Sequence, residues 1–511
     1  MLCMKLKKLA KVVLGMMTLG TMVLSSFVSI ASAAPNDVKP RTIVMTDGEV
    51  DDMDSFLRFM LYTNDFDVRG IIYTSSMWHY KGDGRGTQFT THMDIVKLYH
   101  PGWHTDLRWC GTDWIKEYID KYRIVYPTLL QHDKNYPSPD KLQSLVRVGN
   151  IDFEGEMSYD TEGSEFIKTE LLSEDETPIY FETWGGANTF ARALKSIEDQ
   201  YKGTEKWDSI YKKVSKKAIL YNIMDQDDTY KTYISIKWPD IKVYYNSWQF
   251  GSLAYIWPVT VPETQQKYFR GEWMKKNILK GPLTGGYMTY GDGHKLAGDP
   301  EDKFGSMEEA TKHGYGKYDL ISEGDSPSFL YLINNGLRST ESPTYGGWSG
   351  RLSPSVSTKN LWEDNEGSFD YNPYTKKLDK YYSQTRWIDA IQNDFAARVK
   401  WTMNDYQHAN HAPQGIKIQE GLDIKVKAGE KVTLHASASD PDGDKLNYTW
   451  YPYEEAGYYR ASVAIHGKGQ EVSITVPANA IKGETIHVVL EVIDSGQPPL
   501  TRYARVILTV E

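Results

Sequence analysis

The chain has 511 residues, of which 58 are Lys or Arg and 68 are Asp or Glu, so its formal net charge is −10. An acidic surface repels phosphodiester backbones, which argues against a nucleic-acid partner. Of the two cysteines, Cys3 lies in a predicted leader and Cys110 is left alone, so no intramolecular disulfide is expected and the fold must rest on a large apolar core.

Residues 1–33 read as a secretory signal peptide. Four lysines precede an apolar run from Val12 to Ile30, which ends in Ala31-Ser32-Ala33. This order of basic, apolar and small residues predicts cleavage after Ala33, with an uncleaved signal anchor as the alternative. No later stretch is apolar and long enough to cross a bilayer. We therefore expect a secreted, extracellular protein with no membrane insertion after signal cleavage.

Residues 34–411 are predicted to form an α/β domain, with a mainly parallel sheet flanked by helices. Apolar segments alternate with helical ones, which is typical of β-α-β units. Strands are expected at Thr42–Thr46, Phe66–Ser75, Pro178–Thr183, Ala218–Ile223 and Ile241–Tyr245. Helices are expected after the first strand, through Phe56, and at Asn188–Asp199, Pro327–Leu337 and Ile388–Met403.

Residues 412–511 are predicted to form a separate all-β domain, beyond a short polar linker at His408–Gly415. At least five segments there alternate apolar and polar residues with a period of two, and turn residues separate them. This pattern indicates an immunoglobulin-like β-sandwich. One of its turns, Asp440-Pro-Asp-Gly-Asp, either forms by its own turn chemistry or binds Ca²⁺.

The most informative segment is the acidic turn after the first strand, Thr46-Asp47-Gly48-Glu49-Val50-Asp51-Asp52-Met53-Asp54. In an open parallel sheet, ligands bind beyond the carboxyl ends of the strands, which is where this turn is expected. Crowded carboxylates repel one another unless a cation holds them, and oxygen ligands in this number suit Ca²⁺ better than Zn²⁺. The alternative is a solvated helix start, because acids favour the first turn of a helix.

The segment IVMTDGEVDD (residues 43–52) resembles the N-terminal signature of nucleoside hydrolases, in which an Asp-rich loop binds calcium and activates water. The resemblance implies that Asp47 is the metal-bound general base and that Asp51 and Asp52 are further ligands. FETWGGANT resembles the loop whose backbone carbonyl completes the calcium shell, at Trp184. SEGDSPSF resembles the segment that gives the last metal carboxylate, at Asp325.

The chain departs from the nucleoside hydrolase pattern at three places. Met45 holds the place of a further Asp, and Gly48-Glu49 replaces the usual Pro-Gly. Gly324 replaces a His that handles the leaving base in many relatives. This last difference favours a glycan or glycoside over a free nucleoside as the substrate.

Nearly the whole mature chain resembles a family of bacterial secreted proteins described as cellulose-binding, with a nucleoside hydrolase-like N-terminal domain and a C-terminal β-sandwich. Besides the acidic turn, the resemblance rests on Thr74-Ser75-Ser76, Met224-Asp-Gln-Asp-Asp228, Glu323-Gly-Asp-Ser-Pro-Ser328 and Asn393-Asp-Phe-Ala-Ala-Arg398. It implies contact with a plant-type polysaccharide and does not by itself imply a reaction.

Other polar and aromatic residues at or near the predicted strand ends are expected to bind substrate. They are Glu49, Trp78, His79, Asn188, Asn222 and Asp225. The two amides both donate and accept hydrogen bonds, which suits sugar hydroxyls. His79 either protonates a leaving group near neutral pH or has a structural role. Asp225 either binds hydroxyls or a second cation, or caps a helix.

These features predict a secreted, metal-dependent hydrolase of a glycosidic or N-ribosidic bond, in which Asp47 and Ca²⁺ activate water. The expected partner is a carbohydrate, whether a polysaccharide, a glycoside or a nucleoside. The main alternative is a non-catalytic polysaccharide-binding protein that uses the same cleft. A third hypothesis is a surface interaction protein that docks through its sandwich. No serine-hydrolase elbow, P-loop or Rossmann fingerprint follows a suitable strand.

Overall fold

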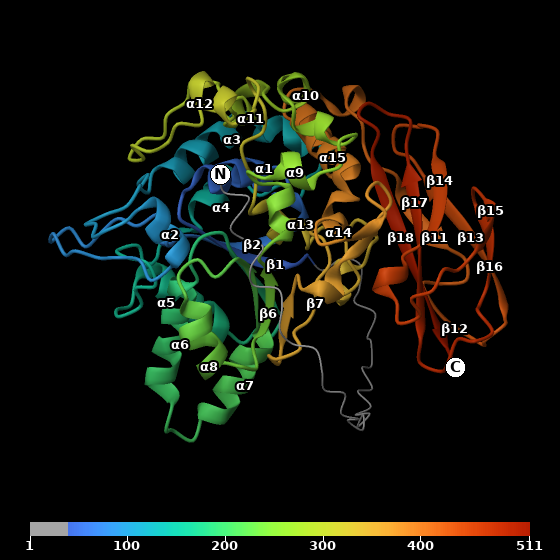
Figure 1. Ribbon diagram of the computed structural model, residues 1–511, viewed down its shortest axis with the longest axis horizontal. Helices are drawn as coiled ribbons and strands as arrows, with labels where there is room; N and C mark the ends of the chain where they lie inside the picture. Colours follow the sequence, from blue (N-terminus) through green and yellow to red (C-terminus); the bar gives the residue numbers. More distant parts are fainter. Residues whose placement is uncertain (1–38) are drawn as a thin grey trace, which may run out of the picture. The chain divides into compact units, whose positions relative to one another are not determined.

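The structure of the protein is a computed structural model, and it describes residues 39–511 (Figure 1). The predicted signal peptide, residues 1–33, lies outside this range. Among the described residues, no helix has both the length and the apolar character needed to cross a bilayer.

An eight-stranded sheet organises the first domain, in the order β3-β2-β1-β4-β5-β6-β8-β7. Every neighbouring pair is parallel except β7 with β8. The strands are β1 (Arg41–Thr46), β2 (Asp67–Tyr73), β3 (Val146–Val148), β4 (Ile179–Thr183), β5 (Ala218–Ile223), β6 (Lys242–Asn246), β7 (Ser353–Pro354) and β8 (Leu361–Glu363). The predicted α/β fold with a mainly parallel sheet is confirmed.

Both faces of the sheet are buried, which explains why its central strands are apolar throughout. Val44 of β1 faces a core that also contains α1 and α3, whereas Ile43 and Met45 face a second core formed with α5, α6 and α7. The longer helices are α1 (Val50–Met60), α3 (Trp114–His132), α5 (Glu162–Leu172), α6 (Asn188–Tyr201), α7 (Trp207–Lys217) and α15 (Ile388–Trp401).

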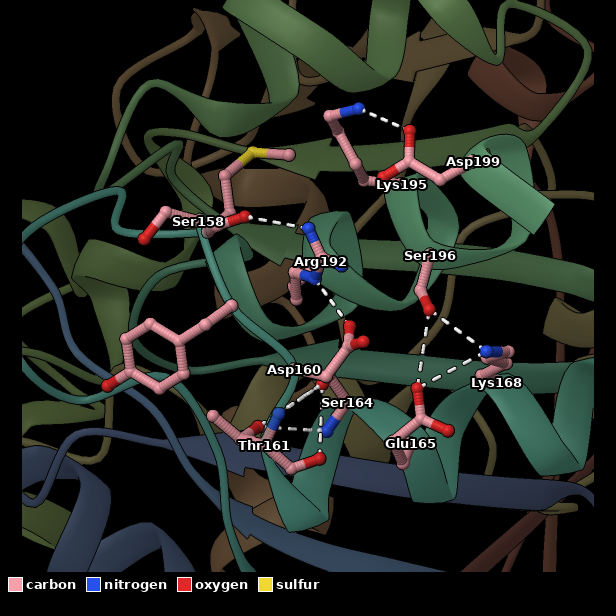
Figure 2. A network of polar contacts seen from close by, with 12 residues as sticks. Ser158, Asp160, Thr161, Ser164, Glu165, Lys168, Arg192, Lys195, Ser196 and Asp199 are labelled. Carbon is pink, nitrogen blue, oxygen red and sulfur yellow. Dashed lines mark hydrogen bonds and ion pairs between the residues drawn. The ribbon is translucent and has the colours of Figure 1, made fainter. Parts of the chain in front are cut away.

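Helix α6 begins at the carboxyl edge of the sheet, and polar contacts fix it to the segment around α5 (Figure 2). Arg192 of α6 pairs with Asp160 at 2.5 Å, and Ser196 accepts a hydrogen bond from Lys168 at 2.9 Å. At the start of α5, Thr161 and Ser164 form a capping box, which satisfies backbone donors at the end of the helix.

The long connection from β6 to β8 consists of short elements that cover one end of the domain (Figure 1). Its helices are α9 (Trp257–Thr260), α10 (Gly271–Asn277), α11 (Gly281–Thr284), α12 (Met307–Lys312) and α13 (Ser326–Leu330). The helix predicted at Pro327–Leu337 is therefore too long. The chain leaves the helix after Leu330 and turns at Asn335-Gly336, where Gly336 has φ +94°.

The remaining α-helices and strands of this domain are short. They are α2 (Asp94–Tyr99), α4 (Pro139–Gln143), α8 (Ser235–Lys237), α14 (Tyr382–Thr385) and a hairpin of β9 (Asp370–Asn372) and β10 (Lys377–Asp379). No helix was predicted at α3, the longest helix described, which contains Pro127, a residue type that usually ends or kinks a helix.

Eight further strands form two four-stranded sheets, β11-β13-β16-β15 and β12-β18-β17-β14, around an apolar core. They are β11 (Gln414–Ile418), β12 (Asp423–Val426), β13 (Lys431–Ser439), β14 (Asn447–Pro452), β15 (Ile465–Lys468), β16 (Glu471–Thr475), β17 (Thr485–Ile493) and β18 (Thr501–Val510). The predicted C-terminal β-sandwich is confirmed as a fold, while its exact boundary at residue 412 stays a prediction.

Candidate functional site

The acidic turn lies between β1 and α1, at the carboxyl edge of the sheet. Strand β1 ends at Thr46 and α1 begins at Val50, so Asp47, Gly48 and Glu49 form the loop. Gly48 has φ +84°, and a Cβ at this position would lie 2.9 Å from Nε1 of Trp114. The loop therefore needs a glycine, because other residues rarely adopt this backbone conformation and would also collide with the indole.

Three carboxylates that are distant in sequence converge here. Each of Asp51, Asp52 and Asp325 offers an oxygen that lies within 4.8 Å of the others. Asp51 and Asp52 come from the first turn of α1, and Asp325 precedes α13. Asp52 and Asp325 are each only 1% exposed. The acids are thus in a helix start, as the alternative prediction held, but they are buried and not solvated.

The electrostatics of this cluster are unfavourable for three bare carboxylates. Burial raises the pKa of Asp51, Asp52 and Asp325 well above the ordinary value, and the neighbouring acids raise it further. Within residues 39–511, no Lys, Arg or His forms an ion pair with any of the three. Their local donors are neutral: Ser322 Oγ donates to Asp51 at 3.3 Å, and Thr46 Oγ1 and the Asp47 amide donate to Asp52.

Asp47 lies beside this cluster with one oxygen free of protein donors. Its Oδ1 accepts the Glu49 amide at 3.4 Å, whereas its buried Oδ2 has no hydrogen-bond partner. A Cβ on Gly185 would lie 2.9 Å from the Asp47 Cβ and Cγ, so the backbone after β4 packs directly on this side chain. Oδ2 of Asp325 likewise lacks a partner.

Trp184 is placed near Asp47 by its backbone, since its amide and that of Gly185 both donate to the Met45 carbonyl. Its indole points into the core, where Nε1 donates to Ser328 Oγ at 2.8 Å. Its carbonyl accepts a hydrogen bond from the Gln226 side chain. The carbonyl keeps a second lone pair, and its predicted role as a metal ligand stays a prediction.

The donor set at this site fits a hard divalent cation. The available atoms are carboxylate oxygens, two of which are buried without a partner, and such ligands suit Ca²⁺. A cation would also offset the mutual repulsion of the acids. Of the sequence-predicted ligands, Asp51, Asp52 and Asp325 are brought together, and Asp47 lies beside them with its amide bonded to Asp52. Their role as metal ligands stays a prediction.

Glu49 and His79, both predicted to bind substrate, face each other at the rim of the cluster. His79 Nε2 lies 3.9 Å from Glu49 Oε2, and the Tyr255 hydroxyl donates to Glu49 Oε1 at 2.9 Å. Tyr255 comes from the β6–β8 connection, where no sequence motif singled it out.

Trp78, the residue before His79, belongs to an aromatic group. Its ring centroid is 6.2 Å from that of Tyr99 and 6.1 Å from that of His100. Tyr99 is 69% exposed, so this group reaches solvent.

The remaining predicted residues have internal partners. The Asn188 side-chain amide donates to Ser75 Oγ and to the carbonyls of Asn150 and Glu156, and it is fully buried. Asn222 is also fully buried, accepts from Thr183 Oγ1 at 2.6 Å, and leaves its Nδ2 without a partner. Both residues therefore hydrogen-bond within the protein and have a structural role. Substrate binding by either of them stays a prediction.

Asp225 closes the turn after β5. Its carboxylate accepts the amides of Tyr230 and Lys231 at 3.3 and 3.1 Å, as the helix-capping alternative predicted. Burial, followed by the nearby Asp227, raises the pKa of Asp225 to about 7. A contact with substrate through this residue stays a prediction.

Comparison with known proteins places this geometry in a family. The model described as "Cellulose-binding Sde182, nucleoside hydrolase-like domain" matches residues 41–352, more than half of the chain. The chain belongs to this family. A second model, described as "Cellulose-binding protein Sde0182, C-terminal domain", matches residues 431–510 and covers most of the sandwich. Both domains of this Sde182 family member are thus accounted for. No curated protein matches the sequence.

Among solved structures, a nucleoside hydrolase-related hypothetical protein from Saccharophagus degradans, associated with carbohydrate metabolism, is similar over 93% of this chain and 100% of its own. The TM-score is 0.68 at 24% identity, which supports the shared fold. The effector protein XOO4466 is 11% identical over 72% of this chain and 95% of its own, and its TM-score of 0.32 is too low to bear on fold or function.

Proposed function

We propose that this Sde182 family member is an extracellular, Ca²⁺-dependent hydrolase that cleaves a glycosidic or N-ribosidic bond, with a plant-type carbohydrate as its partner. The observation that carries the proposal is the unpartnered Oδ2 of Asp47 beside the Asp51, Asp52 and Asp325 cluster. A carboxylate oxygen in this position is free to accept a proton from water.

The chemistry of the proposal follows from the positions of the carboxylates. Bound Ca²⁺ would supply positive charge that offsets the cluster and orients a water molecule and sugar hydroxyls. Asp47 Oδ2 accepts a proton from the attacking water, whose oxygen bonds to the anomeric carbon. Asp52 keeps its orientation through Thr46 and the Asp47 amide, which ties base and ligand into one rigid turn.

A second candidate function is non-catalytic carbohydrate binding in the same place. A Cβ at Gly324 would lie 2.9 Å from Asp51 Oδ2 and 3.0 Å from Phe250 Cδ2, so no larger side chain fits there to serve as an acid. The family description as cellulose-binding favours the same candidate.

Hydrolysis and binding can be separated in one set of experiments. Release of reducing sugar or free base is measured on plant polysaccharides, p-nitrophenyl glycosides and nucleosides with added CaCl₂, beside a pull-down on insoluble cellulose. We expect Asp47→Ala to lose turnover by about 10³-fold or more while it stays folded. Asp120→Ala is the control, because that acid pairs only with surface residues. Full activity of Asp47→Ala would contradict the role of Asp47 as the base. Binding to cellulose without turnover by the wild type would favour the second function, non-catalytic carbohydrate binding.

A further inference from the structure

The two ring nitrogens of His79 have different surroundings. The side chain is wholly buried, and Nδ1 lies 2.7 Å from the Arg108 carbonyl oxygen. Because a carbonyl oxygen only accepts, Nδ1 carries a hydrogen and donates it. Nε2 is buried without any hydrogen-bond partner and faces Glu49 at 3.9 Å. An unpaired buried nitrogen is costly, so its position beside the cluster points to contact with a ligand.

The carbonyl that holds His79 belongs to a strained residue. Arg108 has φ +43°, in the left-handed region that residues with a side chain seldom adopt. Its guanidinium donates to both carboxylate oxygens of Asp299, from Nε to Oδ1 at 3.2 Å and from Nη2 to Oδ2 at 2.9 Å. Burial opposes ionisation of Asp299, yet the bonds to Arg108 prevail and lower its pKa. This bidentate pair stabilises the turn at Arg108, whose carbonyl orients the His79 ring.

We propose that His79 is the acid for the departing group of the substrate, and that Arg108 and Asp299 are positioning residues that aim its Nε2. This inference rests on the proposed hydrolase function. The inference assigns the acid and the base to separate residues, because Asp47 lies beside the cluster whereas His79 faces Glu49 at its rim. It also names a substrate class, namely glycosides or ribosides whose leaving group is too basic to depart unprotonated.

The proposed step is balanced. For this step the His79 ring carries a hydrogen on both nitrogens. The bond from the anomeric carbon to the leaving atom breaks with its electron pair on that atom, which takes the Nε2 proton, and His79 becomes neutral and keeps its hydrogen on Nδ1. The water oxygen bonds to the anomeric carbon, and Asp47 takes the released proton. The products are the hydroxyl sugar and the protonated leaving group, with one water consumed. After the products leave, Asp47 gives up a proton and His79 takes one up, which restores both groups.

Two pairs of probes that share the sugar and differ in the leaving group test this role. They are inosine with p-nitrophenyl β-D-ribofuranoside, and cellobiose with p-nitrophenyl β-D-glucopyranoside. His79→Ala and His79→Gln should lower kcat/KM for inosine or cellobiose by about 10²- to 10⁴-fold. The loss on the nitrophenyl partner should stay below about tenfold, because p-nitrophenolate departs without a proton.

The test of the positioning residues Arg108 and Asp299 must separate an effect on His79 from a general loss of structure. Asp299→Ala should show the same split between leaving groups, by about tenfold or more, whereas a merely structural defect would lower both rates alike. Asp319→Ala is the matched control, since Asp319 also pairs with an arginine in this connection, Arg270, and bonds to the Gly271 amide. It should show no split.

The outcomes distinguish this inference from the proposed function. Equal losses on both members of a probe pair in the His79 variants overturn the role of His79 and leave the function standing. A wild-type protein that cleaves none of the four probes and no polysaccharide overturns both. Thermal unfolding of each variant verifies that the fold is kept, and the Gln variant provides the result if the Ala variant does not fold.

Discussion

Arg58 and Glu323 form an ion pair with no solvent exposure on either side. Arg58 Nε lies 2.7 Å from Glu323 Oε2, and both side chains are 0% exposed. Arg58 belongs to α1, which carries Asp51 and Asp52, and Glu323 lies two residues before Asp325. The pair therefore joins the two segments that bring the acidic cluster together.

Breaking this pair on one side should unfold the protein more easily. We expect Arg58→Met to lower the free energy of unfolding by about 3–5 kcal/mol, because it leaves the Glu323 carboxylate buried without a counter-charge. The double variant Arg58→Met/Glu323→Leu should recover part of this loss. Urea unfolding gives both values, with Lys116→Met in the exposed Lys116–Asp120 pair as a control expected to change little. If the double variant were less stable than Arg58→Met, the unpaired charge of Glu323 would not be the cause of the loss.

Calcium should stabilise the folded protein through the cluster. A cation that binds only the folded state adds about 2.7 kcal/mol at a hundredfold excess over its Kd, so Tm should rise with CaCl₂ and fall with EDTA. Asp325→Asn should lose most of this response. In EDTA it should melt above the wild type, because it removes one of the mutually repelling buried acids.

The sandwich provides a control for the calcium experiment. Asp440, Asp442 and Asp444 also have oxygens within 4.8 Å of one another. Asp442→Asn should leave the main Tm response in place if the α/β cluster is the calcium site. If Asp325→Asn kept the full Tm shift with CaCl₂, the cluster of Asp51, Asp52 and Asp325 would not be the calcium site.

Stability should depend on pH through Glu182 of β4. This side chain is fully buried, and burial raises its pKa from 4.5 to about 8. Between these pH values the folded protein keeps a proton that the unfolded chain has released, so this group's contribution to stability declines as pH rises through the interval. Glu182→Gln cannot ionise, so it should gain up to a few kcal/mol on the wild type from pH 5 to pH 8. Urea unfolding at both pH values measures this difference, and Glu162→Gln, an exposed change, should give a constant offset. A constant offset for Glu182→Gln would refute the prediction.

The acidic loop could be predicted from the sequence because its acids directly follow an apolar strand. Asp47 and Asp51 therefore lie close to each other in the sequence as well as in the structure. Asp325 lies far along the chain, and only the resemblance to nucleoside hydrolases linked it to them. Tyr255 and Asp299 lie in the long β6–β8 connection. Its helices and loops are too short to show a regular spacing of apolar residues, so the sequence does not indicate which side chains are buried or which face the site. The amide of Asn188 follows a strand as a ligand would, and only the three-dimensional structure shows that Ser75 and backbone carbonyls use its hydrogens.

The shape of the loop itself can be tested at Gly48. Gly48 and Gly203 both have φ +84°, but a Cβ at Gly203 meets nothing within 4 Å, whereas one at Gly48 lies 2.9 Å from Trp114 Nε1. Gly203→Ala should therefore cost only the backbone strain, about 1–2 kcal/mol. Gly48→Ala should cost more, because Trp114 is held by the rings of Phe56, Tyr73 and Tyr118 and has little room to move. The displaced loop carries Asp47, so Gly48→Ala should also reduce the Tm shift with CaCl₂ while Gly203→Ala keeps it. If the two variants have equal unfolding free energies and equal calcium responses, the contact with Trp114 does not set the loop.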